Sequence, residues 1–348
     1  MKNKLNIKRF DKNNYIGMLQ SFPKQLDEIV RNKDLIINYE TINNTFNKIL
    51  ICGMGGSAIG GDTVKSIILN KDWLDSELPI NINRDYSIPG WVDSNTFIIL
   101  SSYSGNTEET ISCYKQCITS NATIVVMTSG GKLLKLAKDK NLPYALIPKG
   151  YMPRQALGYS ISIILRILND YKMIKNDIIK DLSLQVNILE KQSNEYLLLE
   201  DKKNQAINLA SQIYDKFNII YTSQKMEVIG LRFRAQLAEN AKILSTHFVF
   251  PEQNHNEIEA FQNLYLDNIN IIWIDDIDNH TKISKRMFLT KQILENVSHI
   301  NIKFNDSCSM TRTLKLINLL DWVSYYSAIY NDTNPYPVDI ISKLKGLL

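Results

Sequence analysis

The apolar positions of this chain predict two series of strands that alternate with helices. Four short, nearly all-apolar runs in the first half are each followed by a segment with helical spacing. Continuous apolar runs of this length, alternating with helices, are typical of a parallel sheet covered on both faces. The predicted strands of the first series are 48–52, 96–100, 123–127 and about 144–147. Those of the second series are 218–221, 269–274 and 299–304.

This rhythm predicts an α/β protein with two lobes. Helical spacing also precedes the first strand, and a long helical stretch separates the two series. The similar rhythm of the two lobes suits distant repeats of one unit, although they share no motif. The predicted divisions are an N-terminal helical segment at 1–46, a first lobe at 47–165, a helical connector at 166–215, a second lobe at 216–330 and a C-terminal tail at 331–348.

Composition narrows the class of protein. The 348 residues are 44% apolar, which is ample for a buried core, and the formal charge of +4 is small. Because the lysines are scattered, we expect no nucleic-acid or membrane partner. The four cysteines form no CxxC pair, and the start MKNKLNIKRF lacks the apolar core of a signal peptide. These features predict a cytoplasmic protein.

The clearest chemical signal is SSYSGNTEET at 101–110, between a predicted strand and a helix. Ser102, Ser104 and Thr107 place hydroxyls around Gly105, which permits a tight turn and close approach to a ligand. Hydroxyls and free N–H groups at a helix N-terminus form an anion site, for which phosphate is the usual ligand. An ordinary helix cap by Ser104 or Thr107 is the alternative. The density of hydroxyls favours phosphate.

A glycine-rich turn, GMGGSAIGGD, follows the strand at 48–52. Gly53, Gly55 and Ala58 match the dinucleotide-binding pattern GxGxxG/A. However, no acidic residue follows at the usual spacing, since Asp85 lies too far along. The extra glycines and Ser57 equally suit close approach to a sugar phosphate, and tight helix–sheet packing is a third explanation. The residues alone leave these alternatives open.

The predicted helix at 228–244 carries a candidate catalytic acid. Arg232, Gln236 and Glu239 fall on one helical face at positions i, i+4 and i+7. A solvated face with local ion pairs, for example through Lys242, is the ordinary explanation. The helix directly follows a strand of the second lobe, where a side chain can face the cleft between lobes. Glu239 is therefore a candidate.

A candidate histidine lies in PEQNHNEIEAF, at 251–261. His255 stands among polar residues where a helix is expected to begin, and histidine passes protons readily near neutral pH. An exposed or helix-capping histidine is the alternative. The other three histidines, His247, His280 and His299, lack comparable surroundings. We predict no metal site, because no group of His, Cys or Asp has metal-ligand spacing.

Together these segments resemble the sugar isomerase (SIS) superfamily and, more closely, its bifunctional phosphoglucose/phosphomannose isomerases. The matching pieces occur in the family's order over nearly the whole chain: GMGGSAIGGD, SSYSGNTEET, TSGGKL, MPRQALGY, AENAK, PEQNHNEI and LKGLL. The resemblance implies two SIS-type, flavodoxin-like subdomains, each a parallel sheet flanked by helices. It also implies a homodimer with active sites at the subunit interface, a sugar-phosphate substrate and no cofactor.

The resemblance also implies roles for individual residues. The phosphate would be held by four hydroxyls, those of Ser102, Ser104, Thr107 and Ser57. The sugar would lie against two glycines, Gly55 and Gly56. Arg154 would face a developing enediolate, and Glu239 would be the catalytic base. His255, supplied by the neighbouring subunit, would open the sugar ring together with a C-terminal lysine, either Lys345 or Lys343. The segment NDTNPYPVD departs from the family's pattern, so no residue is assigned to mannose acceptance.

The expected reaction is aldose–ketose isomerisation through a cis-enediolate, which interconverts glucose-6-phosphate, fructose-6-phosphate and mannose-6-phosphate. A non-catalytic sugar-phosphate regulator would keep SSYSGNTEET but would not need Glu239 and His255. A nucleotide-dependent oxidoreductase would use GMGGSA and leave the hydroxyl-rich segment unexplained. An amidotransferase-type isomerase would normally carry a glutaminase domain with an N-terminal cysteine, which this sequence lacks.

Overall fold

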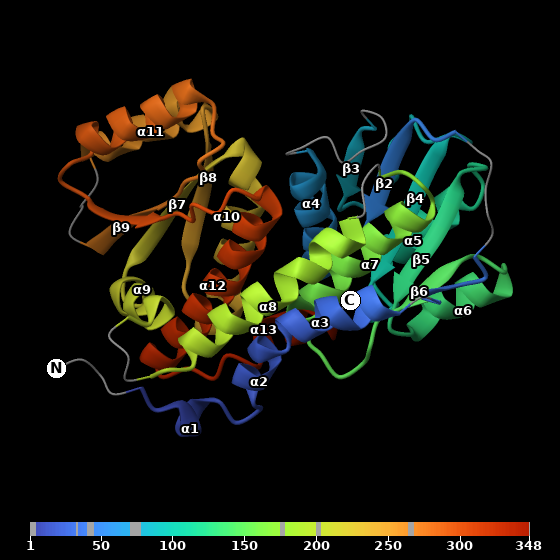
Figure 1. The fold of residues 1–348 in the computed structure, drawn as a ribbon, viewed down its shortest axis with the longest axis horizontal. Helices are drawn as coiled ribbons and strands as arrows, with labels where there is room; N and C mark the ends of the chain where they lie inside the picture. The colour runs from blue at the N-terminus through green and yellow to red at the C-terminus, as the bar shows by residue number, and fades with distance from the viewer. Residues whose placement is uncertain are drawn as a thin grey trace. The chain divides into compact units, whose positions relative to one another are not determined.

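The computed structural model (Figure 1) describes residues 5–32, 34–39, 45–69, 78–174, 178–199, 203–263 and 268–347. The chain divides into two compact units. The first unit is Ser21–Ile188, and the second unit combines Met1–Gln20 with Leu189–Leu348. Among the residues described, each unit contains one sheet whose strands are mainly parallel. The prediction of an α/β protein with two parallel sheets flanked by helices is therefore confirmed.

In the described part of the first unit, one sheet has the strand order β1-β6-β5-β4-β2-β3. Its two-residue strand β1 is antiparallel to β6, and the remaining neighbours are parallel. The strands are β1 (Ile36–Ile37), β2 (Lys48–Cys52), β3 (Ile80–Asn83), β4 (Thr96–Ser102), β5 (Thr123–Thr128) and β6 (Tyr144–Leu146). The helices are α3 (Phe22–Arg31), α4 (Gly55–Leu69), α5 (Glu108–Cys117), α6 (Gly131–Asp139), the 3-10 turn η1 (Pro153–Gln155), α7 (Leu157–Asp170) and α8 (Ile178–Tyr196), which continues into the second unit.

Helices cover both faces of the first sheet, and successive side chains along each buried strand point alternately to the two faces. Leu50 and Leu100 point to the face where they form a buried cluster with residues of α5 and α6. Ile51 points the other way, against Gly61 of α4. On that side Gly60 lies so close to Ser160 of α7 that a β-carbon would be 2.0 Å from the serine hydroxyl oxygen. Two glycines of GMGGSAIGGD therefore serve helix packing.

The described part of the second unit has one four-stranded, fully parallel sheet in the order β10-β9-β7-β8. The strands are β7 (Phe217–Ser223), β8 (Ser245–Phe250), β9 (Ile269–Ile274) and β10 (Ser298–Ile302). The helices are α1 (Ile7–Phe10), α2 (Tyr15–Gln20), α9 (Gln205–Ile213), α10 (Glu227–Gln236), the π-helical turn η3 (Leu237–Ala241), α11 (Thr281–Ile293), α12 (Ser309–Tyr330) and α13 (Asp339–Lys345). Short 3-10 turns are η2 (Gln224–Met226), η4 (Glu252–His255) and η5 (Glu257–Asn263).

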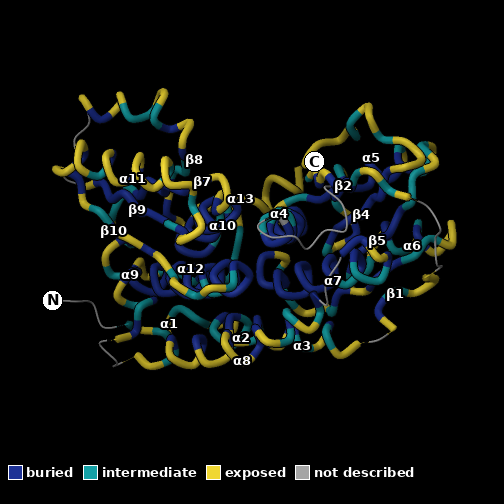
Figure 2. Tube along the Cα trace, turned by 45° about the horizontal axis from the view of Figure 1, so that its top comes forward, coloured by how far each residue is buried: buried dark blue, intermediate teal, exposed yellow. Residues whose placement is uncertain are grey.

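The second sheet is also covered on both faces. Tyr221 and Trp273 pack in one buried cluster with Met287 of α11. Helix α12 is buried over nearly its whole length, as Figure 2 shows by its dark colour. It contacts α9, α10 and α2. This central helix anchors the elements that carry the candidate catalytic acid.

The two sheets repeat one topology. In each, the chain forms a central strand, then an edge strand on one side, and then crosses to the other side, where it adds two parallel strands that both sheets share; the first sheet continues with β6 and β1. This gives β5-β4-β2-β3 in the first unit and β10-β9-β7-β8 in the second. The topology thus repeats although the two lobes share no sequence motif. No helix within the described ranges has the length and apolar character needed to cross a membrane.

Candidate active site

The hydroxyl-rich segment connects β4 to α5 at the carboxyl edge of the first sheet. Thr107 occupies the N-cap position of α5, yet its side chain does not cap the helix. Its hydroxyl oxygen instead lies 2.8 Å from that of Ser102. Ser104 is exposed, and its hydroxyl accepts a hydrogen bond from the Asn106 N–H at 3.2 Å. Helix capping by Thr107 therefore does not explain this segment, and the uncapped start of α5 favours an anion.

Gly105 fixes the turn between these hydroxyls. Its φ of +68° lies in the left-handed region, and a β-carbon there would be 1.8 Å from the Gly130 carbonyl oxygen. The neighbouring segment TSGGKL is bonded to the same turn, since the Leu133 N–H donates to the Gly105 carbonyl at 2.8 Å. A side chain at Gly105 would separate the two segments.

The glycine-rich turn after β2 meets both the hydroxyl-rich segment and the segment that carries Arg154. The Ser57 hydroxyl accepts a hydrogen bond from the Tyr103 N–H at 3.2 Å. At Gly56 a β-carbon would lie 2.6 Å from the Pro153 carbonyl oxygen. Gly55 has a φ of +50° and open space where a side chain would stand. Gly56 thus admits the backbone beside Arg154, a contact that the sequence did not reveal.

Arg154 lies in η1, directly before α7, and only 4% of its surface is exposed. The next residue is anchored to α3, because its carbonyl accepts a hydrogen bond from the Gln25 amide at 2.7 Å. A buried guanidinium is a fixed positive charge, and its planar donors suit oxyanions. The first unit therefore brings Ser57, Ser102 and Thr107 to one sheet edge, and Gly56 joins the Arg154 segment to it.

Glu239 lies in the second unit, in the π-helical turn η3 that ends α10. The polar face predicted for this helix, with Arg232, Gln236 and Glu239, differs from the buried polar stripe that is observed. Arg232 and Gln236 donate to the Asp321 carboxylate of α12, with the shortest distance 2.6 Å. Asn240 continues the stripe by donating to the Ser324 hydroxyl at 2.8 Å. Glu239 lies beside this stripe and is partly exposed. A π-turn widens the helix, and such turns are frequent at functional sites.

Lys242 closes the π-turn, and sequence reasoning missed its contacts. Its backbone is left-handed, with φ +58°. Its ammonium donates to the carbonyl oxygen of Glu239 at 2.7 Å and to that of Pro337 at 2.9 Å. It also donates to the Asn334 carbonyl at 3.3 Å. The Lys242 ammonium thus joins the peptide of Glu239 to the segment before α13. Helix α13 itself carries the exposed candidates Lys343 and Lys345.

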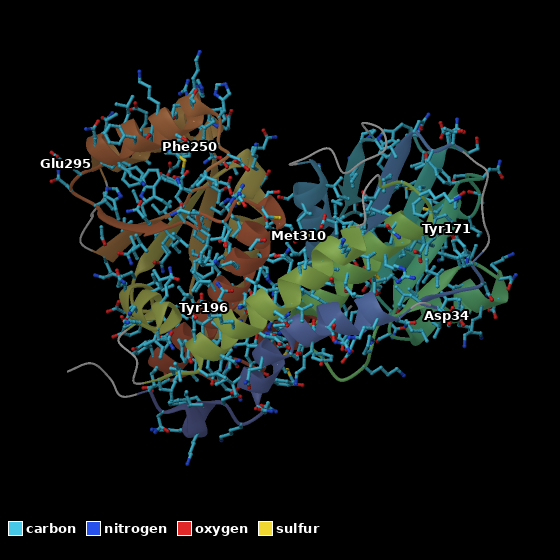
Figure 3. All side chains as sticks on the ribbon, in the orientation of Figure 1. Asp34, Tyr171, Tyr196, Phe250, Glu295 and Met310 are labelled. Atoms are coloured by element: carbon cyan, nitrogen blue, oxygen red, sulfur yellow. The ribbon has the colours of Figure 1, made fainter. Side chains whose placement is uncertain are left out.

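His255 ends the turn η4 after β8 and is exposed. Phe250, labelled in Figure 3, marks the end of β8 just before this turn. Behind the turn, the buried Tyr221 hydroxyl donates to the Glu257 carboxylate at 2.6 Å, and the Gln253 amide donates to the same carboxylate at 2.8 Å. Burial and the adjacent Glu257 raise the pKa of Tyr221, so its phenol stays protonated and donates.

The topology of the second unit separates Glu239 from His255. Helix α10 begins at the carboxyl end of β7, and the chain enters the parallel strand β8 shortly after η3. The α10–η3 segment therefore returns to the amino edge of the sheet, which places Glu239 there. His255 follows β8 at the carboxyl edge. The six residues of β8 separate these edges by about 20 Å. A single second unit does not bring Glu239 and His255 together.

Comparisons with known proteins agree with this architecture. Residues 202–348 match the family model described as the bacterial phospho-glucose isomerase C-terminal SIS domain. The C-terminal domain of a glucosamine-fructose-6-phosphate aminotransferase from Francisella tularensis superposes with a TM-score of 0.68 at 14% identity. That match covers 93% of this chain and 98% of the other, and it supports the fold alone.

Two relatives in sequence carry different names. A bifunctional phosphoglucose/phosphomannose isomerase from Caldicellulosiruptor bescii is 35% identical over 94% of this chain and 97% of its own. A D-glucosamine-6-phosphate 4-epimerase from Sulfolobus acidocaldarius is 34% identical over 63% of this chain and 65% of its own. Fold and sequence therefore define an enzyme of the sugar-phosphate isomerase class with SIS domains. Within that class, the chain belongs to the bifunctional phosphoglucose/phosphomannose isomerase family.

Proposed function

We propose that this protein is a cytoplasmic, homodimeric isomerase that interconverts glucose-6-phosphate, fructose-6-phosphate and mannose-6-phosphate. The observation that carries the proposal is the paired hydroxyls of Ser102 and Thr107, 2.8 Å apart at the uncapped start of α5. Such a site binds the phosphate that all three sugars share. Ser57 and Ser104 add hydroxyls at the same segments, and the buried Arg154 adds positive charge.

In this proposal Glu239 is the general base. It removes the proton from C2 of the aldose and returns it to C1, so one carboxylate serves two adjacent carbons through a cis-enediolate. Arg154 stabilises the negative oxygen of that enediolate. Return of the proton to the opposite face of C2 gives mannose-6-phosphate. The mechanism requires no metal and no redox cofactor. Support comes from the position of Glu239 in a π-turn that Lys242 and α12 hold in place.

His255 opens the cyclic sugar before isomerisation, together with Lys345 or Lys343. Since Glu239 and His255 lie at opposite edges of the second sheet, we propose that the two come from different subunits of a dimer. The surface beside His255 suits such an interface. Asn254 bonds to Thr290 of α11 at 3.0 Å, and α11 exposes 60% of Phe288 and 69% of Ile293. A subunit contact at this surface would cover both apolar side chains.

The alternative is an SIS protein that binds a sugar phosphate without isomerising it. A related outcome is 4-epimerisation of an amino sugar phosphate, which the name of the Sulfolobus relative suggests. The isomerase name belongs to the relative that matches far more of this chain, and the isomerase also gives Glu239 and His255 a use. We therefore favour the isomerase.

A coupled assay tests the proposal. Purified protein treated with a chelator is supplied with fructose-6-phosphate, and glucose-6-phosphate and mannose-6-phosphate are detected separately. We expect both products. Formation of glucose-6-phosphate alone would restrict the enzyme to phosphoglucose isomerisation. Binding of fructose-6-phosphate without either product would favour the regulator, and turnover of glucosamine-6-phosphate alone would favour the epimerase.

A further inference from the structure

The segment before Arg154 contains a four-residue turn that a distant tyrosine bridges. In Pro148–Tyr151, Gly150 has a left-handed φ of +98°. A turn of this length is often closed by a hydrogen bond from its last N–H to its first carbonyl. Here the Tyr103 phenol stands between those groups. Its oxygen accepts from the Tyr151 N–H at 2.9 Å, and its hydroxyl donates to the Pro148 carbonyl at 3.1 Å.

Tyr103 is itself held on both sides of its backbone. Its N–H donates to the Ser57 hydroxyl at 3.2 Å. Its carbonyl accepts from Ser129, at 2.6 Å from the hydroxyl and 3.0 Å from the N–H. Tyr103 belongs to the hydroxyl-rich segment, so it contacts the glycine-rich turn, the TSGGKL segment and the turn before Arg154. Together with the hydroxyl-rich segment itself, these make four segments that meet at the carboxyl edge of the first sheet.

The bridged turn leads directly to Arg154. The ring of Tyr151 packs edge-on against Tyr159 of α7, with centroids 5.5 Å apart. Beyond it, the Pro153 carbonyl approaches Gly56 closely. The position of the Arg154 guanidinium therefore depends on a short run of backbone that is held at two points. The Gly56 contact holds one end of this run, and the Tyr103 phenol holds the other. A hydrogen-bond chain that passes through one hydroxyl, accepting on one side and donating on the other, strengthens both bonds.

We propose that Tyr103 is a positioning residue that fixes the Arg154 segment relative to the phosphate-binding hydroxyls. This inference rests on the proposed function, in which Arg154 faces the enediolate. The two hydrogen bonds that bridge the turn join the phenol to the backbone of Pro148 and Tyr151, not to the phosphate-binding hydroxyls. Its loss therefore leaves phosphate binding intact and allows Arg154 to move. The consequence falls on the transition state rather than on ground-state binding.

The test compares Tyr103→Phe, which removes one oxygen, with Tyr114→Phe as the matched control. Tyr114 lies on α5 in the same unit, and its hydroxyl donates to the Leu136 carbonyl at 3.5 Å, away from the four segments. Two readouts do not need activity: amide hydrogen exchange of the peptide 148–155 and the affinity for inorganic phosphate. The third is kcat with fructose-6-phosphate.

For Tyr103→Phe we expect exchange of the 148–155 peptide to accelerate about tenfold and kcat to fall about tenfold. A tenfold change is the effect expected from the loss of one buried pair of hydrogen bonds. Phosphate affinity stays within about twofold of wild type. Tyr114→Phe changes none of these. The proposal is overturned if exchange and kcat match the control, or if phosphate affinity falls as far as kcat. If the wild type has no isomerase activity, the exchange and phosphate readouts still decide whether the phenol holds this turn.

Discussion

The ammonium of Lys242 lies 2.7 Å from the carbonyl oxygen of Glu239 and 2.9 Å from that of Pro337. The lysine therefore fastens the π-turn of the proposed base to the segment that precedes α13. This relationship accounts for a left-handed backbone at a residue other than glycine, because the strain of that conformation is offset by several charge-assisted hydrogen bonds.

We predict that Lys242→Met lowers kcat about tenfold while the affinity for inorganic phosphate stays unchanged, because Glu239 is displaced but the hydroxyls are not. Steady-state kinetics and phosphate titration provide the measurement. Lys225→Met is the matched control, since Lys225 also donates to a backbone carbonyl of the second unit, that of Asp278 at 3.0 Å. An equal loss of kcat in both variants would mean that removal of any such lysine lowers activity.

Thr107→Val keeps the shape of the side chain but removes the hydroxyl that lies 2.8 Å from that of Ser102. Since the phosphate does not change during the reaction, its contacts act equally on ground state and transition state. We expect KM for fructose-6-phosphate to rise about tenfold, with kcat within about twofold. Thr119→Val, an exposed threonine just after the same helix, provides the comparison. An unchanged KM would remove Thr107 from the phosphate site.

A mixed-subunit experiment tests whether Glu239 and His255 act in one site from different chains. Glu239→Gln and His255→Ala are each expected to be nearly inactive alone. When the two are unfolded and refolded together at equal amounts, half of the dimers combine one chain of each kind. Each such dimer has one intact site, so about a quarter of wild-type activity returns. Activity that stays at the level of the separate variants would contradict sites shared between subunits.

His247 makes the stability of the second unit depend on pH. Its ring bonds to the Thr222 hydroxyl at 2.8 Å, and burial, with the charge of Arg234, lowers its pKa from 6.5 to about 4. Between these values the unfolded chain binds the additional proton, so stability is complete above about pH 6.5 and is lost as pH falls toward 4. The loss attributable to His247 is on the order of 3 kcal/mol at most.

Unfolding in denaturant at pH 7 and pH 5 measures this effect. In His247→Gln the difference between the two pH values is expected to shrink, whatever the absolute stability of the variant. His299, whose pKa burial also lowers, retains its own share in both proteins. An undiminished pH difference in the variant would assign the effect to other groups.

The strands that the sequence predicted well are buried on both faces. KILIC at 48–52 and INIIWI at 269–274 have the bounds of β2 and β9, because short, nearly all-apolar runs leave little choice. Three edge strands of the described residues were not predicted, and one of them is β1, a two-residue strand in the segment predicted to be helical. ININ of β3 and STHFVF of β8 mix polar with apolar residues, since only one neighbouring strand and less packing constrain an edge.

The sequence predicts those parts of the candidate site whose residues are close together along the chain. The hydroxyls of Ser102 and Thr107 are five residues apart, and their pairing follows from a strand–turn–helix connection. The contacts of Tyr103 with Pro148 and of Lys242 with Pro337 join distant residues and leave no local signal. The π-turn was also not predicted, because helical spacing assumes a constant 3.6 residues per turn. That assumption placed Glu239 on the polar stripe of the helix, whereas the π-turn places it beside the stripe.

The central claim is isomerisation with Glu239 as base, and one assay tests it most directly. Wild type, Glu239→Gln and Glu227→Gln, an exposed acid at the start of the same helix, are compared with fructose-6-phosphate. Glucose-6-phosphate and mannose-6-phosphate are quantified separately. We predict both products from wild type and Glu227→Gln, and a loss of about 10²- to 10⁴-fold in Glu239→Gln with fructose-6-phosphate affinity retained. No product from the wild type, or full activity in Glu239→Gln, would contradict the account.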